Sequence, residues 1–370
     1  MKKKLVYVFR SLAVWGGIER ILTDKMNWLA AHGHDVSIIT TDQGMHPLPY
    51  PLDERVHHID LGIAFHHQYR YHGLHRLTDG WNRQHRFERL LSQQLEQLQP
   101  DIIIGTTNCF TATLTRLKPA GTPLIIESHS IFRQLADTGR LTWLRRQRML
   151  HILKKADMLV TLTEGDAREW ATCLKQVTHI PNINSLSATG KAVGRKKQVL
   201  FVGRLEPQKQ PDHLLRIWQR VAPSHPDWSL HIYGDGELRP WVESQVKTMG
   251  SSVVLHEPTS HIANCYLESC ILVLTSGYEP FGLVMPEAMS CGVPVVAYDC
   301  PFGPRDIISD GQDGFLVPPQ DTDCFAQKLC RLMDDEELRT AMGRNARSAA
   351  QRFCADSIMP QWLQLFEQLT

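Results

Sequence analysis

The sequence predicts an α/β protein with two domains, each containing a parallel β-sheet wrapped by helices. Short runs rich in Val, Ile and Leu alternate with helical patterns along the chain, and continuous apolar runs of this length are typical of strands buried on both faces. The alternation pauses once and then begins again, which indicates two sheets rather than one. The length of 370 residues allows two domains of ordinary size, each with its own core.

A small and polar stretch, Ile183 to Gly190, separates the two series of expected strands. A basic run follows it, and this composition is typical of a linker between domains. We therefore expect a first domain over residues 1–185, a linker over 186–197, a second domain over 198–352 and a helical end over 353–370. The expected strands are Leu5–Phe9, Asp35–Thr40, Asp101–Ile104, Pro123–Glu127 and Met158–Thr161, and then Val199–Val202, Leu230–Tyr233, Val253–Leu255, Ile271–Leu274 and Val295–Ala297.

Composition argues against several classes of function. Because 40 Lys and Arg nearly balance 39 Asp and Glu, no net field favours nucleic acid as a partner. Nine scattered cysteines without a Cys-x-x-Cys argue against a disulfide framework and a zinc site. The apolar run after the Lys-rich start is too short for a signal peptide, and no run approaches the roughly 18 apolar residues of a membrane-spanning helix. We expect a cytoplasmic protein, at most peripheral on the inner face of the membrane.

Two carboxylates beyond the expected strand Ile271–Leu274 form the most informative pattern. Glu279 lies in the loop after this strand, and Glu287 lies in the short helix that follows. Ligands of open α/β sheets bind beyond the carboxyl ends of the strands, where carboxylates accept hydrogen bonds from sugar hydroxyls. Backbone amides at the start of the helix are suited to a diphosphate. The pattern therefore predicts a sugar-nucleotide site, with the amides of Phe281, Gly282 and Leu283 toward the anion.

The first loop of the second domain adds two cations to this site. Gly203 and Arg204 follow the strand Val199–Val202, and Lys209 comes shortly after them. A guanidinium offers a planar fork to phosphate oxygens and an ammonium offers a compact charge, so the two could neutralise a leaving diphosphate without a metal. The alternative interpretation is a pair of solvated loop charges.

The first domain carries two further candidate features. Gly16 and Gly17 stand between the first expected strand and a helix that should run to about His32, and glycines there allow a ligand to approach the backbone closely. His129 closes the strand Pro123–Glu127 on the ligand side, where it could bind a sugar hydroxyl or transfer a proton. A flexible turn and a structural histidine are the alternatives.

These motifs together resemble the retaining glycosyltransferases of family 4, of the bacterial polysaccharide and lipopolysaccharide type. The segment Tyr278–Ala297 carries most of the resemblance, which continues through Asp299–Ile308 and Asp313–Val317. Gly16–Glu19 is similar to the family's Gly-Gly-x-Glu motif, and Gly203–Gln210 is similar to its Gly-Arg loop, where the family has Gly in place of Gln210. The resemblance implies the GT-B fold, in which two Rossmann-like domains face each other across a cleft and a C-terminal helix returns to the first.

The resemblance also implies the roles of the site residues. The donor would lie mostly on the second domain, where Glu287 accepts from ribose hydroxyls, Glu279 orients the sugar, and Arg204 and Lys209 stabilise the leaving diphosphate. His129 would complete the catalytic set from the first domain, and Gly16 and Gly17 would meet the diphosphate and the acceptor.

The implied reaction moves a hexosyl group, with retention, from a nucleoside diphosphate sugar to a glycan or lipid-linked hydroxyl in cell-surface polysaccharide synthesis. A UDP-sugar is the favoured donor and GDP-mannose the second candidate. The alternatives are a nucleotide-sugar 2-epimerase on the same fold and a non-catalytic glycan-binding or nucleotide-binding protein.

Three remaining features have simpler interpretations. Asp321-Thr322-Asp323 has the Asp-x-Asp pattern of a metal site, but it directly precedes a helical run, so we interpret it as a helix cap and expect no essential metal or other cofactor. The basic and apolar stretches 65–91 and 139–155 would suit an acceptor or an anionic membrane surface. Ordinary solvated helices packed on the sheet explain both stretches as well.

Overall fold

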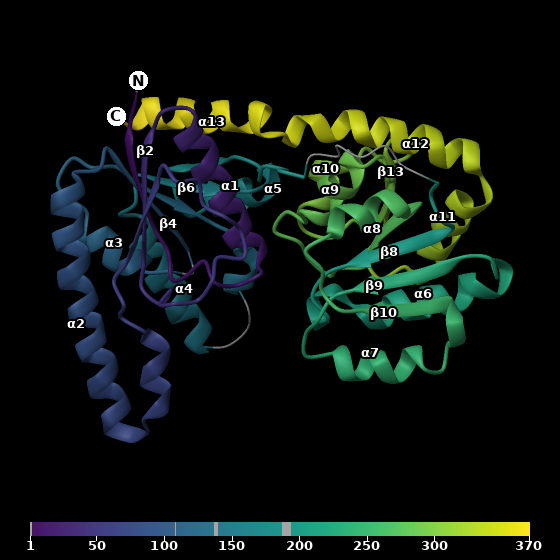
Figure 1. Cartoon of the computed structure of the whole chain (residues 1–370), viewed down its shortest axis with the longest axis horizontal. Helices are drawn as coiled ribbons and strands as arrows, with labels where there is room; N and C mark the ends of the chain where they lie inside the picture. The colour runs from purple at the N-terminus through teal and green to yellow at the C-terminus, as the bar shows by residue number, and fades with distance from the viewer. Residues whose placement is uncertain (1, 108, 137–139, 187–193) are drawn as a thin grey trace. The chain divides into compact units, whose positions relative to one another are not determined.

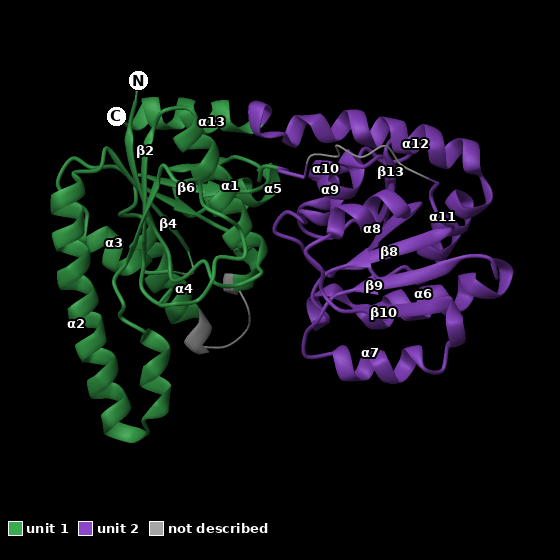
Figure 2. Ribbon diagram, viewed as in Figure 1, with its two compact units in different colours: residues 1–183, 358–370 green, residues 184–357 purple. Residues whose placement is uncertain are grey.

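A computed structural model describes residues 2–107, 109–136, 140–186 and 194–370, and the chain forms two compact units. Unit 1 comprises Met1–Ile183 and Ile358–Thr370, and unit 2 comprises Asn184–Ser357 (Figure 2). Part of the linker expected over 186–197, residues 187–193, lies outside the described residues.

Unit 1 is built on a seven-stranded parallel sheet with the strand order β3-β2-β1-β4-β5-β6-β7 (Figure 1). Its strands are β1 (Lys4–Val8), β2 (Asp35–Thr40), β3 (Val56–Asp60), β4 (Ile102–Thr106), β5 (Leu124–Glu127), β6 (Met158–Thr161) and β7 (Val177–His179). Its helices are α1 (Gly17–Ala31), α2 (Gly73–Leu98), α3 (Thr111–Leu117), α4 (Arg140–Leu153), α5 (Glu164–Ala171) and most of α13 (Ala355–Leu369), with 3-10 turns at η1 (Phe65–Arg70) and η2 (Phe132–Ala136).

Unit 2 repeats this plan with six parallel strands in the order β10-β9-β8-β11-β12-β13 (Figure 1). Its strands are β8 (Gln198–Val202), β9 (Ser229–Tyr233), β10 (Val253–His256), β11 (Ile271–Leu274), β12 (Val295–Tyr298) and β13 (Gly314–Val317). Its helices are α6 (Pro211–Val221), α7 (Arg239–Val246), α8 (Ile262–Glu268), α9 (Val284–Ser290), α10 (Pro304–Ile307), α11 (Thr322–Asp334) and α12 (Glu336–Ala349), with 3-10 turns at η3 (Pro207–Lys209), η4 (Ala222–Ser224), η5 (Gly250–Ser252) and η6 (Ala350–Phe353).

The predicted α/β fold with two parallel sheets is confirmed. All ten expected strands are present, and their ends differ from the expected ones by no more than two residues. The sequence interpretation missed β3, β7 and β13, each of which lies at an edge of its sheet. The edge strands β3 and β7 contain polar residues that interrupt the apolar run typical of a central strand, whereas β13 is apolar but begins with Gly314, a residue typical of turns.

Strand β1 shows that both faces of the unit 1 sheet are covered. Successive side chains of a strand point to opposite faces of its sheet. In β1, Val6 and Val8 pack in one core cluster with residues of α2, α3 and α4. Tyr7 points the other way, where Lys25 of α1 lies over its ring. Among the described residues, no helix is both long enough and apolar enough to cross a membrane.

The strand order reverses once in each sheet, between β1 and β4 in unit 1 and between β8 and β11 in unit 2. At such a reversal, the loops that leave neighbouring strands turn in opposite directions and open a crevice at the carboxyl edge of the sheet. The carboxyl edge at each reversal is therefore the place where a ligand is expected, and the candidate residues follow β1 and β5 in unit 1 and β8 and β11 in unit 2.

Candidate active site

A buried ion pair joins the two loops that flank the strand reversal of unit 2. Lys209, which ends η3 after β8, places its Nζ 2.5 Å from Oε1 of Glu279, which follows β11. Their side chains are only 13% and 4% exposed. Ser276 donates to the same oxygen at 2.6 Å. The sequence predicted both charged residues for this site, and the structure brings them together although 70 positions separate them.

Backbone contacts hold these two loops in register. The amide of Gly277 donates to the carbonyl of Gln208 at 2.8 Å, and Thr275 Oγ1 donates to the carbonyl of Lys209 at 2.9 Å. Gln210, which replaces the Gly expected from the family resemblance, has a φ of 48°. Because glycine is favoured in this left-handed region, the backbone here keeps the shape that a glycine would adopt readily.

The other two residues of the first loop differ in their surroundings. Arg204 is 65% exposed and pairs with Glu206 at 2.8 Å, so its guanidinium lies at the surface. Gly203 lies beside the stem of Lys209, whose Cε would be 3.5 Å from a Cβ built on that glycine. The stem of Lys209 thus passes over the backbone at Gly203 before its ammonium reaches Glu279.

Glu287, the second predicted carboxylate, lies buried in α9 and is oriented by a residue that the sequence interpretation missed. Tyr266 of α8, itself fully buried, donates its hydroxyl to Glu287 Oε2 at 2.8 Å. Tyr266 is the one buried residue of α8, and a lone buried phenol gives no distinctive sequence pattern, so only the fold reveals this contact.

The turn before α9 is tightly packed and requires a glycine at Gly282. Gly282 has a φ of 86°, which favours glycine, and a Cβ there would lie 2.6 Å from the Met285 side chain. Phe281 is buried and packs edge-on against Phe353, which anchors the turn. No hydrogen bond joins the amides of Phe281, Gly282 or Leu283 to another described residue.

In unit 1, the predicted glycine pair begins α1, with Gly16 as its N-cap. A Cβ on Gly16 would lie 2.1 Å from Oε2 of Glu19, so the carboxylate of Glu19 folds back over the start of the helix. Burial raises the pKa of Glu19, while its own backbone amide and the charge of His129 act in the opposite direction. The helix start therefore presents a carboxylate, which suits the hydroxyls of a sugar better than a phosphate.

His129 lies beside a second buried ion pair. Its Nε2 is 3.5 Å from Oε2 of Glu127, the last residue of β5. The same oxygen accepts from Lys25 of α1, and the ring of Trp362 in α13 lies 4.2 Å from the Lys25 ammonium. Burial alone would raise the pKa of Glu127, but the charges of Lys25 and His129 outweigh it and hold the pKa at about 2. This carboxylate is therefore ionised throughout the physiological range.

The Asp-x-Asp motif caps α11, as the sequence predicted. Asp321 Oδ1 accepts from the amide of Cys324 at 2.9 Å, and Asp323 pairs with Arg220. Among the described residues, no group of three or more His, Cys, Asp or Glu is arranged to hold a metal ion. Thr163 likewise caps α5 by accepting from the amide of Asp166.

Replacing Asp321 by Ala is expected to lower the free energy of unfolding by about 1 kcal/mol, since the helix loses its cap. Asp323→Ala removes only an exposed pair and should cost less than about 1 kcal/mol. Urea unfolding of both variants provides the measurement. A loss of activity in Asp321→Ala that added divalent metal restores would contradict the assignment as a cap.

The two basic stretches of the sequence lie in unit 1 and expose apolar side chains. Residues 65–91 form η1 and part of α2, where Tyr69, Leu77 and Trp81 are exposed. In the stretch 139–155, residue 139 lies outside the described residues, and the rest forms α4 and the turn after it. Trp143 and Leu144 are exposed, whereas Leu150 and Leu153 pack into the core. Each helix thus packs on the sheet by one side only.

Comparisons with known proteins match both units to glycosyltransferase families. The family model described as Glycosyltransferase Family 4 matches residues 15–183, and the model described as Glycosyl transferases group 1 matches residues 183–349. The two matches thus cover most of unit 1 and unit 2 in turn.

Several curated proteins are similar to the chain along much of its length. An amylovoran biosynthesis glycosyltransferase, AmsD of Erwinia amylovora, is 26% identical over 97% of this chain and 98% of its own length. An α-1,4-N-acetyl-D-galactosaminyltransferase of Campylobacter jejuni, which acts on a diNAcBac-PP-undecaprenol glycan, is 29% identical over 96% of each chain. An exopolysaccharide phosphotransferase of Streptomyces coelicolor is 32% identical over 75% of this chain, but the match spans only 30% of that protein.

A solved structure shows the same fold. Staphylococcus aureus TarM, in complex with fondaparinux, α-GlcNAc-glycerol and UDP, superposes with a TM-score of 0.80 at 17% identity, over 98% of this chain and 99% of TarM. Because two glycosyltransferase family models match the chain in succession and its sheets are those of the GT-B fold, the protein belongs to the glycosyltransferases, with a Family 4 domain followed by a group 1 domain.

Proposed function

We propose that the protein is a retaining hexosyltransferase that uses a nucleoside diphosphate sugar, with a UDP-sugar favoured and GDP-mannose as the second candidate. The observation that carries this proposal is the buried Lys209–Glu279 pair at the strand reversal of unit 2. It places a fixed cation and a fixed carboxylate side by side. A sugar diphosphate has phosphate oxygens for the cation and sugar hydroxyls for the carboxylate.

The hydrogen-bonding capacity of the pair supports this assignment. An ammonium has three donors, and Lys209 uses one of them on Glu279, which leaves two for phosphate oxygens. Glu279 uses Oε1 for Lys209 and Ser276, while no hydrogen bond joins its Oε2 to another described residue. Oε2 can therefore accept from a hydroxyl of the transferred sugar. Glu287, held by Tyr266, would accept from the ribose.

The proposed reaction needs no nucleophile from the protein. The bond between the anomeric carbon and the diphosphate oxygen breaks, and the electron pair leaves with the diphosphate. The acceptor oxygen bonds to the same face of that carbon, and its proton passes to a diphosphate oxygen. Lys209 stabilises the charge that develops on the leaving group, and such fixed electrostatic contacts are usually the largest contribution to catalysis. Arg204, being exposed, would add to the same field at the mouth of the site.

The acceptor is proposed to be a hydroxyl of a glycan or lipid-linked glycan in cell-surface polysaccharide synthesis. The Campylobacter relative acts on an undecaprenol-linked glycan, and AmsD acts in amylovoran biosynthesis. In unit 1, Glu19 and His129 provide polar groups for acceptor hydroxyls at the carboxyl edge of the sheet. The exposed aromatic and basic side chains of α2 and α4 would suit a membrane-anchored acceptor and peripheral binding on the cytoplasmic face.

An assay of nucleoside diphosphate release tests this function. The protein is incubated with UDP-sugars or GDP-mannose, with and without undecaprenyl diphosphate-linked oligosaccharides, and the anomeric configuration of the product is read by NMR. Release that depends on acceptor, retention of configuration and full activity in EDTA are expected. Epimerised donor without acceptor would support the 2-epimerase, and donor binding without turnover on any acceptor would support a binding protein.

A further inference from the structure

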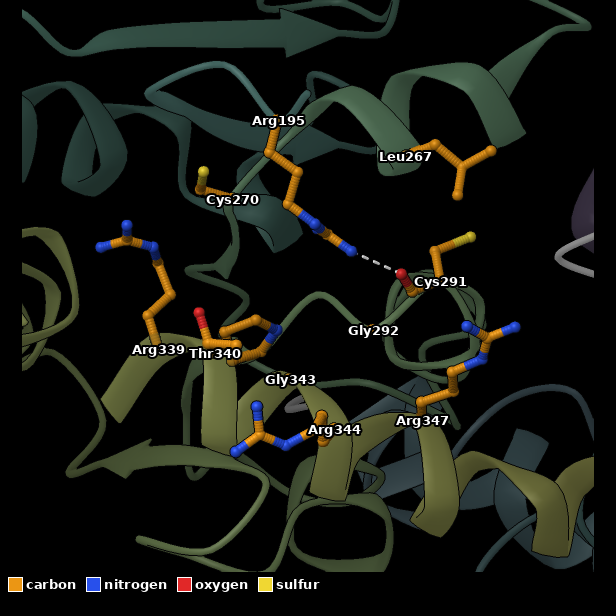
Figure 3. A pocket seen from close by; sticks show the side chains of 11 residues that line it. Arg195, Leu267, Cys270, Cys291, Gly292, Arg339, Thr340, Gly343, Arg344 and Arg347 are labelled. Carbon is orange, nitrogen blue, oxygen red and sulfur yellow. Dashed lines mark hydrogen bonds between the residues drawn. The ribbon is translucent and has the colours of Figure 1, made fainter. Parts of the chain in front are cut away.

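Unit 2 contains a cavity lined by four arginines, apart from the candidate donor site. It has a volume of about 210 Å³. Figure 3 shows Arg195 reaching in from one wall, with side chains of α12 on the opposite wall. We call it the arginine pocket; its lining includes Arg195, Cys291, Arg339, Gly343, Arg344 and Arg347.

One face of α12 forms the basic wall of this pocket. Arg339, Gly343 and Arg347 are spaced four residues apart, so they lie along one side of the helix, and Arg344 is next to them. Gly343 allows the wall to lie close, because a Cβ there would be 2.4 Å from the carbonyl oxygen of Gly292. The pocket is thus formed by the packing of α12 against the end of α9.

The arginine pocket lies at the opposite edge of the sheet from the candidate donor site. Cys270 directly precedes β11, Pro294 directly precedes β12, and both line the pocket, so it opens at the amino ends of these strands. Lys209 and Glu279 follow the carboxyl ends of β8 and β11. A ligand in the pocket would therefore be distinct from the sugar donor.

The charges around the pocket are poorly compensated. Among the described residues, the only ion pair between one of these arginines and a carboxylate joins Arg339 to Glu336 at 4.0 Å, and Glu336 is 85% exposed. Arg195 donates to the carbonyls of Ser269 and Cys291 at 2.5 and 2.6 Å, and Arg339 donates to the carbonyls of Leu332 and Met333 at 2.6 and 3.3 Å. No such contact joins Arg344 or Arg347 to another described residue. The pocket therefore offers two unused guanidinium groups in the field of two others.

The repulsion among these charges also affects Arg195. Burial lowers the pKa of its guanidinium; the neighbouring thiols of Cys270 and Cys291 act against this, and the positive charges of Arg339 and Arg347 act in the same direction as burial. An anion between them would compensate this repulsion and replace solvent around Arg344 and Arg347 with charge-assisted hydrogen bonds.

We propose that the arginine pocket binds a phosphate-bearing anion of about the size of diphosphate. Guanidinium groups match phosphate oxygens in geometry and charge. The two unused groups, of Arg344 and Arg347, together with the positive field of Arg195 and Arg339, suit a ligand with more than one negative charge. The volume of about 210 Å³ lies below the roughly 300–1,000 Å³ of sites that enclose drug-sized ligands, which favours a small anion or a headgroup over a whole nucleotide sugar.

Calorimetric titration of inorganic diphosphate into the full chain tests the proposal. The Lys209→Met background removes the contribution of the candidate donor site. Saturable binding with one equivalent is expected, and Arg344→Gln/Arg347→Gln should weaken it at least about tenfold, since each lost charge-assisted hydrogen bond contributes about that much. Arg168→Gln/Arg216→Gln, which changes exposed arginines of α5 and α6, removes equal charge elsewhere and should leave the affinity unchanged.

Two further measurements separate a binding defect from a folding defect. Without diphosphate, the double variant should melt no lower than its parent, because removing like charges relieves repulsion, and the rise in Tm caused by diphosphate should disappear. Thr340→Glu places a carboxylate in the pocket without removing any arginine, and it should also abolish diphosphate binding.

Vesicle sedimentation identifies the source of the phosphate. Phosphatidylglycerol vesicles that bind the parent but not Arg344→Gln/Arg347→Gln, together with weak binding of free diphosphate, would assign the pocket to a lipid headgroup. Tight diphosphate binding without vesicle binding would assign it to a free anion. The proposal would be overturned if the parent bound neither diphosphate nor vesicles. It would also be overturned if Arg344→Gln/Arg347→Gln and Thr340→Glu still bound the ligand that the parent binds.

Discussion

Replacing Lys209 by Met is expected to lower kcat at least about a hundredfold, the effect of losing one preorganised charge contact with the transition state. The reason is specific to this fold. The ammonium is held 2.5 Å from Glu279 before any donor binds, so it needs no reorganisation as charge develops on the leaving diphosphate. Since the developing charge exceeds that of the ground state, kcat should fall more than KM rises. Steady-state kinetics with the donor identified by the release assay provide the measurement.

The ion pair also predicts how two substitutions combine. Glu279→Gln keeps the shape of the side chain but removes the charge that fixes Lys209, so it should lower kcat by a similar factor. Because the two residues act as one unit, Lys209→Met/Glu279→Gln should be little worse than the poorer single variant. Lys247→Met, on an exposed lysine near α7, is the matched control and should retain activity.

Stability distinguishes this role from a purely structural one. If the pair only held the two loops together, kcat would fall in proportion to the fraction of protein that is unfolded. The double variant, which has no unpaired charge, would then regain much of the lost kcat. Near-normal turnover in both single variants, with stable folds, would show that Lys209 and Glu279 do not belong to the catalytic machinery.

The central strands were predictable because burial on both faces leaves a direct record in the sequence. Ile271–Leu274 and Met158–Thr161 are continuous apolar runs, and the structure places strands at those bounds. β3 spans Val56–Asp60, in which two histidines and an aspartate interrupt the apolar residues. An edge strand of this kind cannot be told from a polar loop by periodicity alone.

The site was predictable to the extent that its residues stand next to strand ends. Lys209 and Glu279 both follow apolar runs, and parallel strands bring their carboxyl ends to one edge. Tyr266 was not predictable, because its contact with Glu287 depends on how α8 packs against α9. Lys25 did leave a signal: it stands within the apolar stripe of α1, between Leu22 and Met26, where an exposed lysine would not be expected.

Lys25→Met is expected to destabilise unit 1 by about 3–5 kcal/mol, the usual cost of removing one partner from a buried ion pair. Met fills much of the volume of the lysine stem, so the loss arises mainly from the charge. Glu127 would remain buried with only His129 to compensate its charge, and its pKa would rise from about 2. Hydrogen exchange of amides in α1 and β5 measures the effect in unit 1 separately from unit 2. Lys118→Met, which breaks a more exposed pair with Asp157, should cost less than about 1 kcal/mol.

The pH dependence of stability and a second substitution test whether the charge of Glu127 causes the destabilisation in Lys25→Met. A carboxyl whose pKa falls from 4.5 to about 2 on folding contributes stability that is fully present above about pH 4.5 and is lost as the pH falls toward 2. In Lys25→Met the sign reverses, because burial then raises the pKa of Glu127 and protonation relieves the penalty. The difference in free energy of unfolding between the parent and Lys25→Met should therefore be largest near pH 7 and become smaller toward pH 4. Lys25→Met/Glu127→Gln should recover most of the stability at pH 7. A deficit that is independent of pH and persists in the double variant would assign the effect to lost packing against Tyr7 and Trp362 instead.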